Sequence, residues 1–324
     1  MHTCPPPKEA FKERFLECPT INGTFGHTLL EQLNVDDGSL AAALKSYFES
    51  AHLDARQVFH ADIGIDLHPD AEEEEPLVTY PGSLPSTTRR GLFGEVLAGL
   101  LTETYKYVGG NNWCVPIFLF RHHDDAFQYL FTLARDPAKM RQTIGRLGSD
   151  FIGLSLNEDG EVVKIISGEA KWRKTLTQGV VDGLMLGEWI VKDKNKKKSK
   201  SNRMRSGKGV WYYLNNEPSP PSGIRQLQRL LQECDPDGYE AAILSLDKAL
   251  VVKSPEPIPK TDLIVVAGNS SVTRKQSECL LPFEKVPPDY TAENNLQIME
   301  VFFSKGEELI DKIYDSLWEG AHDA

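Results

Sequence analysis

The sequence has few cysteines and no long apolar run, and both absences limit what the protein can be. Its 324 residues include five cysteines and no Cys-x-x-Cys pair, which argues against a disulfide framework and against a zinc knuckle. No stretch approaches the roughly 18 apolar residues that cross a membrane. The first residues, MHTCPPPKEAFKERF, lack the apolar stretch of a signal peptide. We therefore expect a cytoplasmic protein without a membrane partner.

The sequence also lacks a Gly-x4-Gly-Lys-Ser/Thr phosphate loop, so it carries no nucleotide-driven motor of that type. What it does contain is typical of a globular protein, with 40% hydrophobic and 26% charged residues. A chain of this length can build a sizeable core, as one large domain or as two.

The negative net charge of −11 hides a strongly basic segment. Between Glu169 and Lys208 there are twelve Lys and Arg against four Asp and Glu, a local charge of +8. Its last part, residues 192–208, has no apolar periodicity and cannot bury a core. We predict that this tract contacts the phosphates of a polyanion, although it could also be a solvated insertion without a role. The basic candidates are Lys194, Lys196, Lys197, Lys198, Lys200, Arg203 and Arg205.

The stretch from residue 145 to 171, GRLGSDFIGLSLNEDGEVVKIISGEAK, predicts a β-hairpin. Asp159-Gly160 favours a tight turn because glycine tolerates a positive φ. A turn centred there places Asp150 opposite Glu169. A turn one residue earlier places Asp150 opposite Ser167, on the same face as Glu169. The two-residue period of a strand brings Lys171 to that face as well.

Two acids and a lysine on one inner face are costly to bury without compensation. A divalent cation would supply it, because carboxylate oxygens and water suit Mg²⁺ or Mn²⁺. A lysine beside the metal can position an attacking water or help to deprotonate it. The alternative is an exposed hairpin end with a solvated Glu-Lys pair, which would contribute little energy.

These residues resemble the signature of the PD-(D/E)xK nuclease superfamily. Asp150 stands on one strand, and Glu169-Ala170-Lys171, the only Glu-x-Lys in the chain, stands on the next. Ser149 occupies the position of the proline in the family's name. The resemblance implies an α/β, restriction-endonuclease-like core with a central mixed sheet flanked by helices. This core would span residues 85–324, after an N-terminal accessory region of residues 1–84.

The resemblance also implies an activity. We expect Mg²⁺-dependent hydrolysis of phosphodiester bonds in nucleic acid, DNA rather than RNA. Asp150 and Glu169 would hold the metal, and Lys171 would orient or activate the water. Superfamily members often lend a Glu from the helix before the sheet, and Glu95 lies near the apolar stripe of a predicted helix over residues 88–107. We expect Glu95 to complete the metal shell, although it could instead form a salt bridge.

Two further expectations come from resemblance. Gln178, near the start of a predicted helix over residues 174–190, resembles a glutamine that orients substrate or lysine in some superfamily members. Over about residues 85–320 the chain also resembles the HamA nuclease subunits of Hachiman anti-phage defence systems, through Gly94-Glu95 and the hairpin. That likeness implies a helicase or ATPase partner.

Two alternatives of other classes stay open. The chain could be an inactive nuclease-like module that binds nucleic acid or a partner protein. It could also be a phosphohydrolase that uses the cluster His122-His123-Asp124-Asp125. Elsewhere the patterns predict a helix that begins near Asp37, a strand over residues 58–69, a buried strand over 115–120, a helix over 224–233, a strand over 261–269 and a helix over 296–320.

Overall fold

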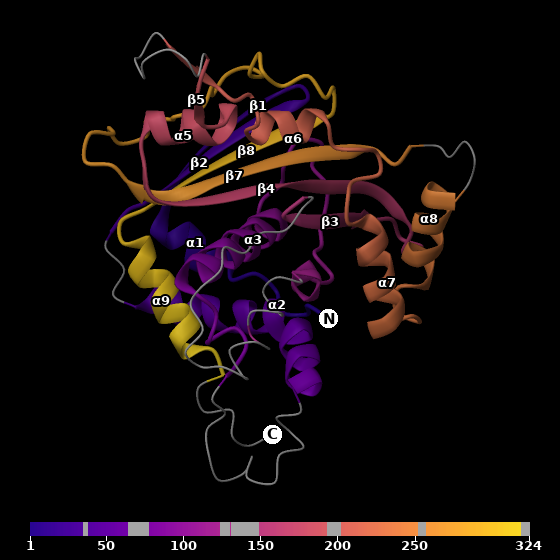
Figure 1. Ribbon diagram of the computed structural model, residues 1–324. Helices are drawn as coiled ribbons and strands as arrows, with labels where there is room; N and C mark the ends of the chain where they lie inside the picture. Colours follow the sequence, from indigo (N-terminus) through magenta and orange to yellow (C-terminus); the bar gives the residue numbers. More distant parts are fainter. Residues whose placement is uncertain are drawn as a thin grey trace.

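A computed structural model of the chain describes residues 1–34, 38–63, 78–123, 130, 149–192, 202–251 and 257–318. Its centre is a six-stranded sheet in the order β1-β2-β8-β7-β4-β3. The four middle strands are parallel, and each outer strand is antiparallel to its neighbour. Helices cover both faces of this mixed sheet (Figure 1), so the predicted α/β class is confirmed.

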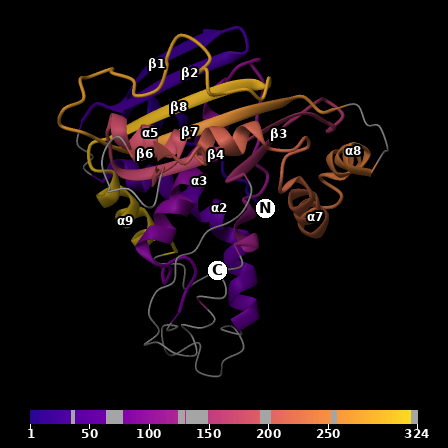
Figure 2. The ribbon, with the colours of Figure 1, turned by 45° about the horizontal axis from the view of Figure 1, so that its top comes forward.

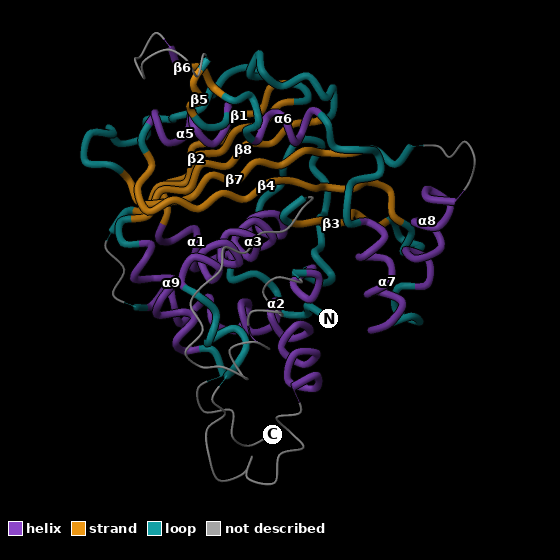
Figure 3. The backbone as a smooth tube through the Cα atoms, in the orientation of Figure 1, coloured by secondary structure: helices purple, strands orange, loops and turns teal. Residues whose placement is uncertain are grey.

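The strands run side by side across the molecule (Figure 3). The central sheet consists of β1 (Phe15–Asn22), β2 (Phe25–Gln32), β3 (Phe151–Leu156), β4 (Val162–Leu176), β7 (Lys260–Ser270) and β8 (Asn295–Phe303). A separate antiparallel pair consists of β5 (Trp189–Val191) and β6 (Arg203–Arg205).

The helices form two layers and a smaller group. The larger layer holds α1 (Lys8–Arg14), α2 (Ser39–Ile63), α3 (Ser86–Thr104) and α9 (Gly306–Ser316). The other face carries α5 (Gln178–Leu186) and α6 (Val210–Asn215), which lie in front of the sheet in Figure 2. The helices α7 (Ile224–Cys234) and α8 (Glu240–Val251) pack against β3 and the start of β4. A short 3-10 helix, η2, spans Leu119–His122.

The alternation of β4 decides which side chains reach which layer. Ile166, Ala170 and Trp172 belong to the core beneath the sheet, with the side chains of α3. Glu169 and Lys171 alternate with these residues and therefore point to the opposite face of the sheet, which α5 covers. Thr177 then ends the strand and caps α5, where its side-chain oxygen accepts the N–H of Val180. The helix predicted from residue 174 consequently begins only at Gln178.

The N-terminal residues are part of the same sheet. Strand β2 pairs with β8 over seven residues, from Phe25↔Leu296 to Glu31↔Phe302. Buried side chains of α2 belong to the same core cluster as those of α3 and α9. The predicted boundary at residue 84 does not divide the sheet. Strand β2, before this boundary, pairs directly with β8, after it.

Three predicted elements differ from those observed. Residues 58–63 continue α2 instead of forming a strand, and residues 64–69 lie outside the described part. Residues 115–120 form no strand; the chain makes one bridge at Cys114↔Leu154 and then enters η2. The segment predicted as a helix over 296–320 is β8 followed by α9, because its apolar half is buried between β2 and β7.

Among the described helices, none combines the length and the apolar character that a membrane crossing requires.

Candidate active site

The β3–β4 hairpin has the predicted register at the residues of interest. Phe151 pairs with Gly168, which places Asp150 opposite Glu169. At the other end, the side-chain oxygen of Asn157 accepts the N–H groups of Asp159 and Glu161, at 3.1 and 2.8 Å. A bulge next to Leu156 adjusts the strands to this wider loop. The turn is thus longer than a two-residue turn, but the register at Asp150 agrees with the prediction.

Asp150, Glu169 and Lys171 meet at the end of this hairpin. The Lys171 ammonium donates a hydrogen bond to Asp150 Oδ2 at 2.8 Å, and its other carboxylate contact is with Glu169. The N–H of Ala170 donates to the same Asp150 oxygen at 2.8 Å. Glu169 is 7% exposed, and Asp150 and Lys171 are half-buried, so this is not a solvated hairpin end. The structure therefore brings together the three side chains that the pattern predicted on one face.

The charges in this cluster are not balanced. Burial, and then the negative charge of Asp150, raise the pKa of Glu169 to about 7, and the favourable effect of Lys171 is smaller. Burial alone would lower the pKa of Lys171, but the two carboxylates outweigh it and raise that pKa. Two acids thus surround a single ammonium. The site is suited to an additional positive charge.

Glu95 approaches the cluster from α3, on the other side of β4. Helix and strand lie close, since a Cβ on Gly94 would be 3.7 Å from the Ala170 Cβ. Glu95 is 6% exposed, and its Oε2 lies 3.4 Å from His123 Nε2. That oxygen has no hydrogen bond among the described residues. Glu95 and Asp150 line the same cavity of about 410 Å³, so the third predicted ligand borders the site.

A second cavity, of about 540 Å³, lies on the α5 side of the strand. Asp150, Lys171 and Arg173 line both cavities. They can do so because β3 begins only at Phe151, so that the last part of β4 is not paired on that side among the residues described. The cluster is therefore open to a ligand from the edge of the sheet.

The residues present fit a hard divalent cation. Asp150 and Glu169 supply carboxylate oxygens, and such ligands suit Mg²⁺ or Mn²⁺. Glu95 lines the first cavity and Glu169 the second, and in this structure the three carboxylates do not place one oxygen each within 4.8 Å of the others. Glu95 Oε2, which makes no hydrogen bond among the described residues, and the excess of negative charge both favour a cation at this position. In the structure the Lys171 ammonium partly neutralises the same two carboxylates.

The predicted nucleic-acid contacts are only partly visible. Lys194, Lys196, Lys197, Lys198 and Lys200 lie outside the described residues. Arg203 and Arg205 are on β6, whose neighbours Ser206 and Lys208 line the second cavity. The Arg205 guanidinium lies 4.3 Å from the centre of the Trp189 ring and donates to the Gly187 carbonyl.

Gln178 lies at the start of α5, as part of the wall above the sheet. Its amide donates to the carbonyl of Leu280 at 2.9 Å and to the carboxylate of Asp182 at 2.8 Å. The contact with Leu280 attaches α5 to the chain between β7 and β8, and the contact with Asp182 lies within α5. The hydrogen bonds of the Gln178 side chain do not reach Lys171, so in this structure it does not orient the lysine.

Two residues at the site, Arg173 and Lys208, were not singled out by sequence reasoning, and His123 was considered only for the phosphohydrolase alternative. Arg173 follows Lys171 by two residues, so the strand period alone could have placed it there. Lys208 was counted only as part of the basic tract, yet it lines the cavity with Glu169. His123 approaches Glu95 through tertiary packing, for which the sequence gives no pattern. Asp124 and Asp125, the other half of the proposed histidine-aspartate cluster, lie outside the described residues.

The fold and the cluster together define an α/β protein whose edge hairpin carries two carboxylates and a lysine. Comparison with protein-family models finds none that matches the chain, and comparison with curated proteins finds no match. What this site does therefore has to be inferred from its own chemistry.

Proposed function

We propose that the protein is a Mg²⁺-dependent nuclease with a restriction-endonuclease-like core of the PD-(D/E)xK type. The observation that supports this most is the contact of Lys171 with both Asp150 and Glu169 at an open sheet edge. Two acids and a lysine from adjoining strands, with a cavity on either side, provide metal ligands, a proton-handling group and room for a phosphodiester.

The side chains then have distinct tasks. Asp150 and Glu169 would hold the cation, and Glu95 would approach it from the α3 side. A divalent cation bound there would supply Lewis-acid chemistry, polarising a phosphate and acidifying a water molecule. Lys171 holds the attacking water in line and, as an ammonium, stabilises the negative charge that develops on the phosphate. The Ala170 N–H keeps the Asp150 carboxylate fixed, so little reorganisation is needed when substrate arrives.

The substrate that fits these surroundings is a nucleic-acid backbone. Arg173 and Lys208 are exposed cations on the border of the second cavity, and the segment that follows the site has a local charge of +8. Cations of this kind bind phosphates without discriminating between bases. We infer DNA as the substrate, with any sequence specificity supplied from elsewhere.

We also infer a setting from the likeness to HamA-type subunits. The nuclease would be the effector of an anti-phage defence system, and a helicase partner would supply unwinding. The absence of a Gly-x4-Gly-Lys-Ser/Thr loop from the chain agrees with this division of tasks. The helicase requirement is tested by adding a candidate partner to the cleavage assay.

The direct test is a digestion assay with plasmid and single-stranded DNA, in Mg²⁺, in Mn²⁺ and in EDTA. We expect cleavage by the wild-type protein with metal, and a loss of at least 100-fold in Asp150→Asn and in Lys171→Ala. Asp159→Asn is a matched control, because it removes a carboxylate from the exposed tip of the same hairpin. It should cleave like the wild type.

Circular dichroism and thermal melting must confirm that the variants are folded. Metal-independent activity, or full activity in Asp150→Asn, would contradict the proposal. DNA binding without cleavage under every condition, including with a helicase, would identify a binding module instead. His123 contacts a proposed ligand, so the phosphohydrolase alternative is tested with His122→Ala, which the nuclease proposal expects to be near normal.

A further inference from the structure

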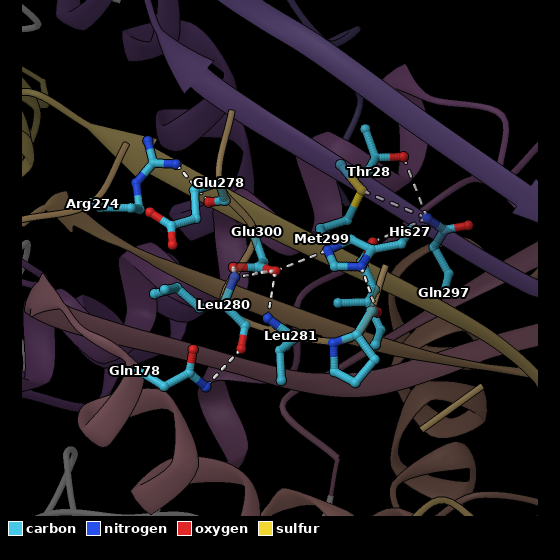
Figure 4. Close-up of polar contacts among 12 residues, drawn as sticks. His27, Thr28, Gln178, Arg274, Glu278, Leu280, Leu281, Gln297, Met299 and Glu300 are labelled. Atoms are coloured by element: carbon cyan, nitrogen blue, oxygen red, sulfur yellow. Dashed lines mark hydrogen bonds and ion pairs between the residues drawn. The ribbon is translucent and has the colours of Figure 1, made fainter. Parts of the chain in front are cut away.

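A second group of possible metal ligands lies away from the candidate active site. It contains His27 on β2, Glu300 on β8 and Cys279 in the segment that joins β7 to β8. One ligand atom of each lies within 4.8 Å of the others. His27 and Glu300 are 0% exposed, and Cys279 is half-buried. Figure 4 shows the imidazole of His27 beside the carboxylate of Glu300.

The orientation of the His27 ring is fixed by its backbone partner. Nδ1 lies 2.9 Å from the carbonyl oxygen of Pro282. A carbonyl only accepts hydrogen bonds, so Nδ1 must carry the proton that is shared there. In a neutral ring, Nε2 therefore presents a lone pair. A metal-binding histidine typically has this arrangement, with one nitrogen donating to a carbonyl and the other free for the ion.

The free nitrogen points at another acceptor. His27 Nε2 lies 3.0 Å from Glu300 Oε1, but it makes no hydrogen bond in the described structure. Two lone pairs that face each other inside the protein repel unless something positive lies at that place. A proton on Nε2 or a metal ion would satisfy both atoms, and the Cys279 sulfur nearby is a third donor atom that a metal ion could use.

The carboxylate is held from its other side. The N–H groups of Leu280 and Leu281 donate to the Glu300 carboxylate at 2.9 and 3.0 Å. These contacts fix the direction of the carboxylate, as outer contacts do around metal ligands. They also place residue 279 directly next to the site. The thiol is therefore brought to the histidine and the glutamate by the same short segment.

We propose that His27, Cys279 and Glu300 bind one zinc ion, with water as the fourth ligand. Imidazole, thiolate and carboxylate together are a zinc donor set, whereas Mg²⁺ prefers oxygen alone. Zinc bonds of about 2.0 to 2.3 Å place tetrahedral ligands about 3.3 to 3.8 Å apart. His27 Nε2 and Glu300 Oε1, now 3.0 Å apart, would therefore open slightly, and the Cys279 sulfur, within 4.8 Å of both, would move closer. On binding, the Cys279 thiol gives up its proton to solvent.

The ion would be a structural one, and its effect would extend to the candidate active site. It would attach the segment between β7 and β8 to the inner strands β2 and β8. Leu280, the neighbour of Cys279, also accepts the side-chain N–H of Gln178 from α5. Residues of α5 line the second cavity beside Glu169. Zinc would thus stabilise the wall of that cavity without contacting the reacting groups.

The test starts from the full-length wild-type protein, produced with zinc in the medium and dialysed. We expect about one equivalent of zinc per chain by elemental analysis, and a Tm that falls by several degrees after strong chelation and recovers with zinc alone. Cys279→Ser should retain less than a tenth of the zinc. Cys234→Ser removes an exposed cysteine elsewhere and should retain all of it. Asp150→Asn should also retain it, which separates this site from the proposed nuclease site.

Replacement by Co²⁺ gives a readout that does not depend on the variants being stable. A thiolate-to-cobalt absorption band should appear in the wild type and be absent from Cys279→Ser. Wild-type protein without zinc, whose Tm does not respond to zinc, would overturn the proposal and leave a protonated His27 paired with Glu300. Unchanged zinc content in Cys279→Ser would overturn it as well.

Discussion

The backbone N–H of Ala170 donates a hydrogen bond to the carboxylate of Asp150 at 2.8 Å. Through this contact a side chain takes the place of a strand partner, at the point where β3 has not yet begun and the edge of β4 would otherwise be unpaired. The same carboxylate binds Lys171, so the geometry of the candidate site depends on how β4 itself is held.

The position of Glu169 depends on the glycine before it. A Cβ on Gly168 would lie 1.8 Å from the carbonyl oxygen of Leu263 and 2.7 Å from its carbon, on the paired strand β7. Backbone atoms cannot move aside, so we expect Gly168→Ala to lower the free energy of unfolding by about 3 kcal/mol or more and to abolish cleavage. Urea denaturation measures the first effect.

Gly179→Ala is the control for this substitution. Gly179 is helical, and a Cβ there meets nothing within 4 Å. It should leave activity intact and stabilise the protein by up to about 1 kcal/mol. Equal stability of Gly168→Ala and the wild type would contradict the close approach of β4 to β7.

Arg173 and Lys208 should contribute to DNA affinity rather than to chemistry. Both line the cavity beside Glu169, and each would release about one counterion from a bound phosphate. We expect Arg173→Ala and Lys208→Ala each to weaken binding and to reduce the slope of log K against log salt by about 1. Fluorescence anisotropy over a salt series measures this. Lys12→Ala, on exposed α1, is the control, and a slope unchanged in both test variants would exclude the phosphate contacts.

In the absence of metal, Glu169 should make the free energy of unfolding decrease as the pH rises. Glu169 has a folded pKa of about 7 against an ordinary value of 4.5, so between these values the folded chain keeps a proton that the unfolded chain has lost. Wild-type stability should fall across this window by about 1 to 3 kcal/mol more than that of Glu169→Gln. Urea denaturation in EDTA at pH 4.5 and pH 8 measures it, and parallel profiles would contradict it.

His52 should have the opposite pH dependence. Complete burial, and then the nearby His123, lower its pKa from 6.5 to about 3, and the hydroxyls of Tyr80 and Tyr314 lie 3.0 and 3.1 Å from its ring nitrogens. The unfolded chain takes up a proton below pH 6.5 that the folded chain refuses. Stability should therefore fall by up to about 1.4 kcal/mol per pH unit below that value.

The variant that isolates this effect is His52→Gln. It should be less stable than the wild type at pH 7 but lose less on acidification to pH 5, as measured by urea denaturation. Because Glu169 acts in the opposite direction, each effect is taken from the difference between variant and wild type. An identical acid dependence in His52→Gln would show that another group is responsible.

Local patterns predicted the hairpin, and distant contacts explain what they missed. The Asp159-Gly160 turn and the alternation around it lie within one short stretch, so the register that brings Asp150 to Glu169 could be derived from neighbours alone. The apolar run LQIMEVFF has no period of two, because β8 is buried on both faces, and it was mistaken for a helix. The meeting of Glu95 with His123 depends on how α3 packs, which no local pattern contains.

The pairing of β2 with β8 has a consequence for how the protein is made. These neighbours in the sheet come from opposite ends of the chain, whereas the β3–β4 hairpin can form from one short segment. During translation the hairpin acids and lysine leave the ribosome long before the last strand does. The sheet can close only after β8 has emerged, so a nascent chain that ends before β8 would carry the charged cluster without the framework that fixes it.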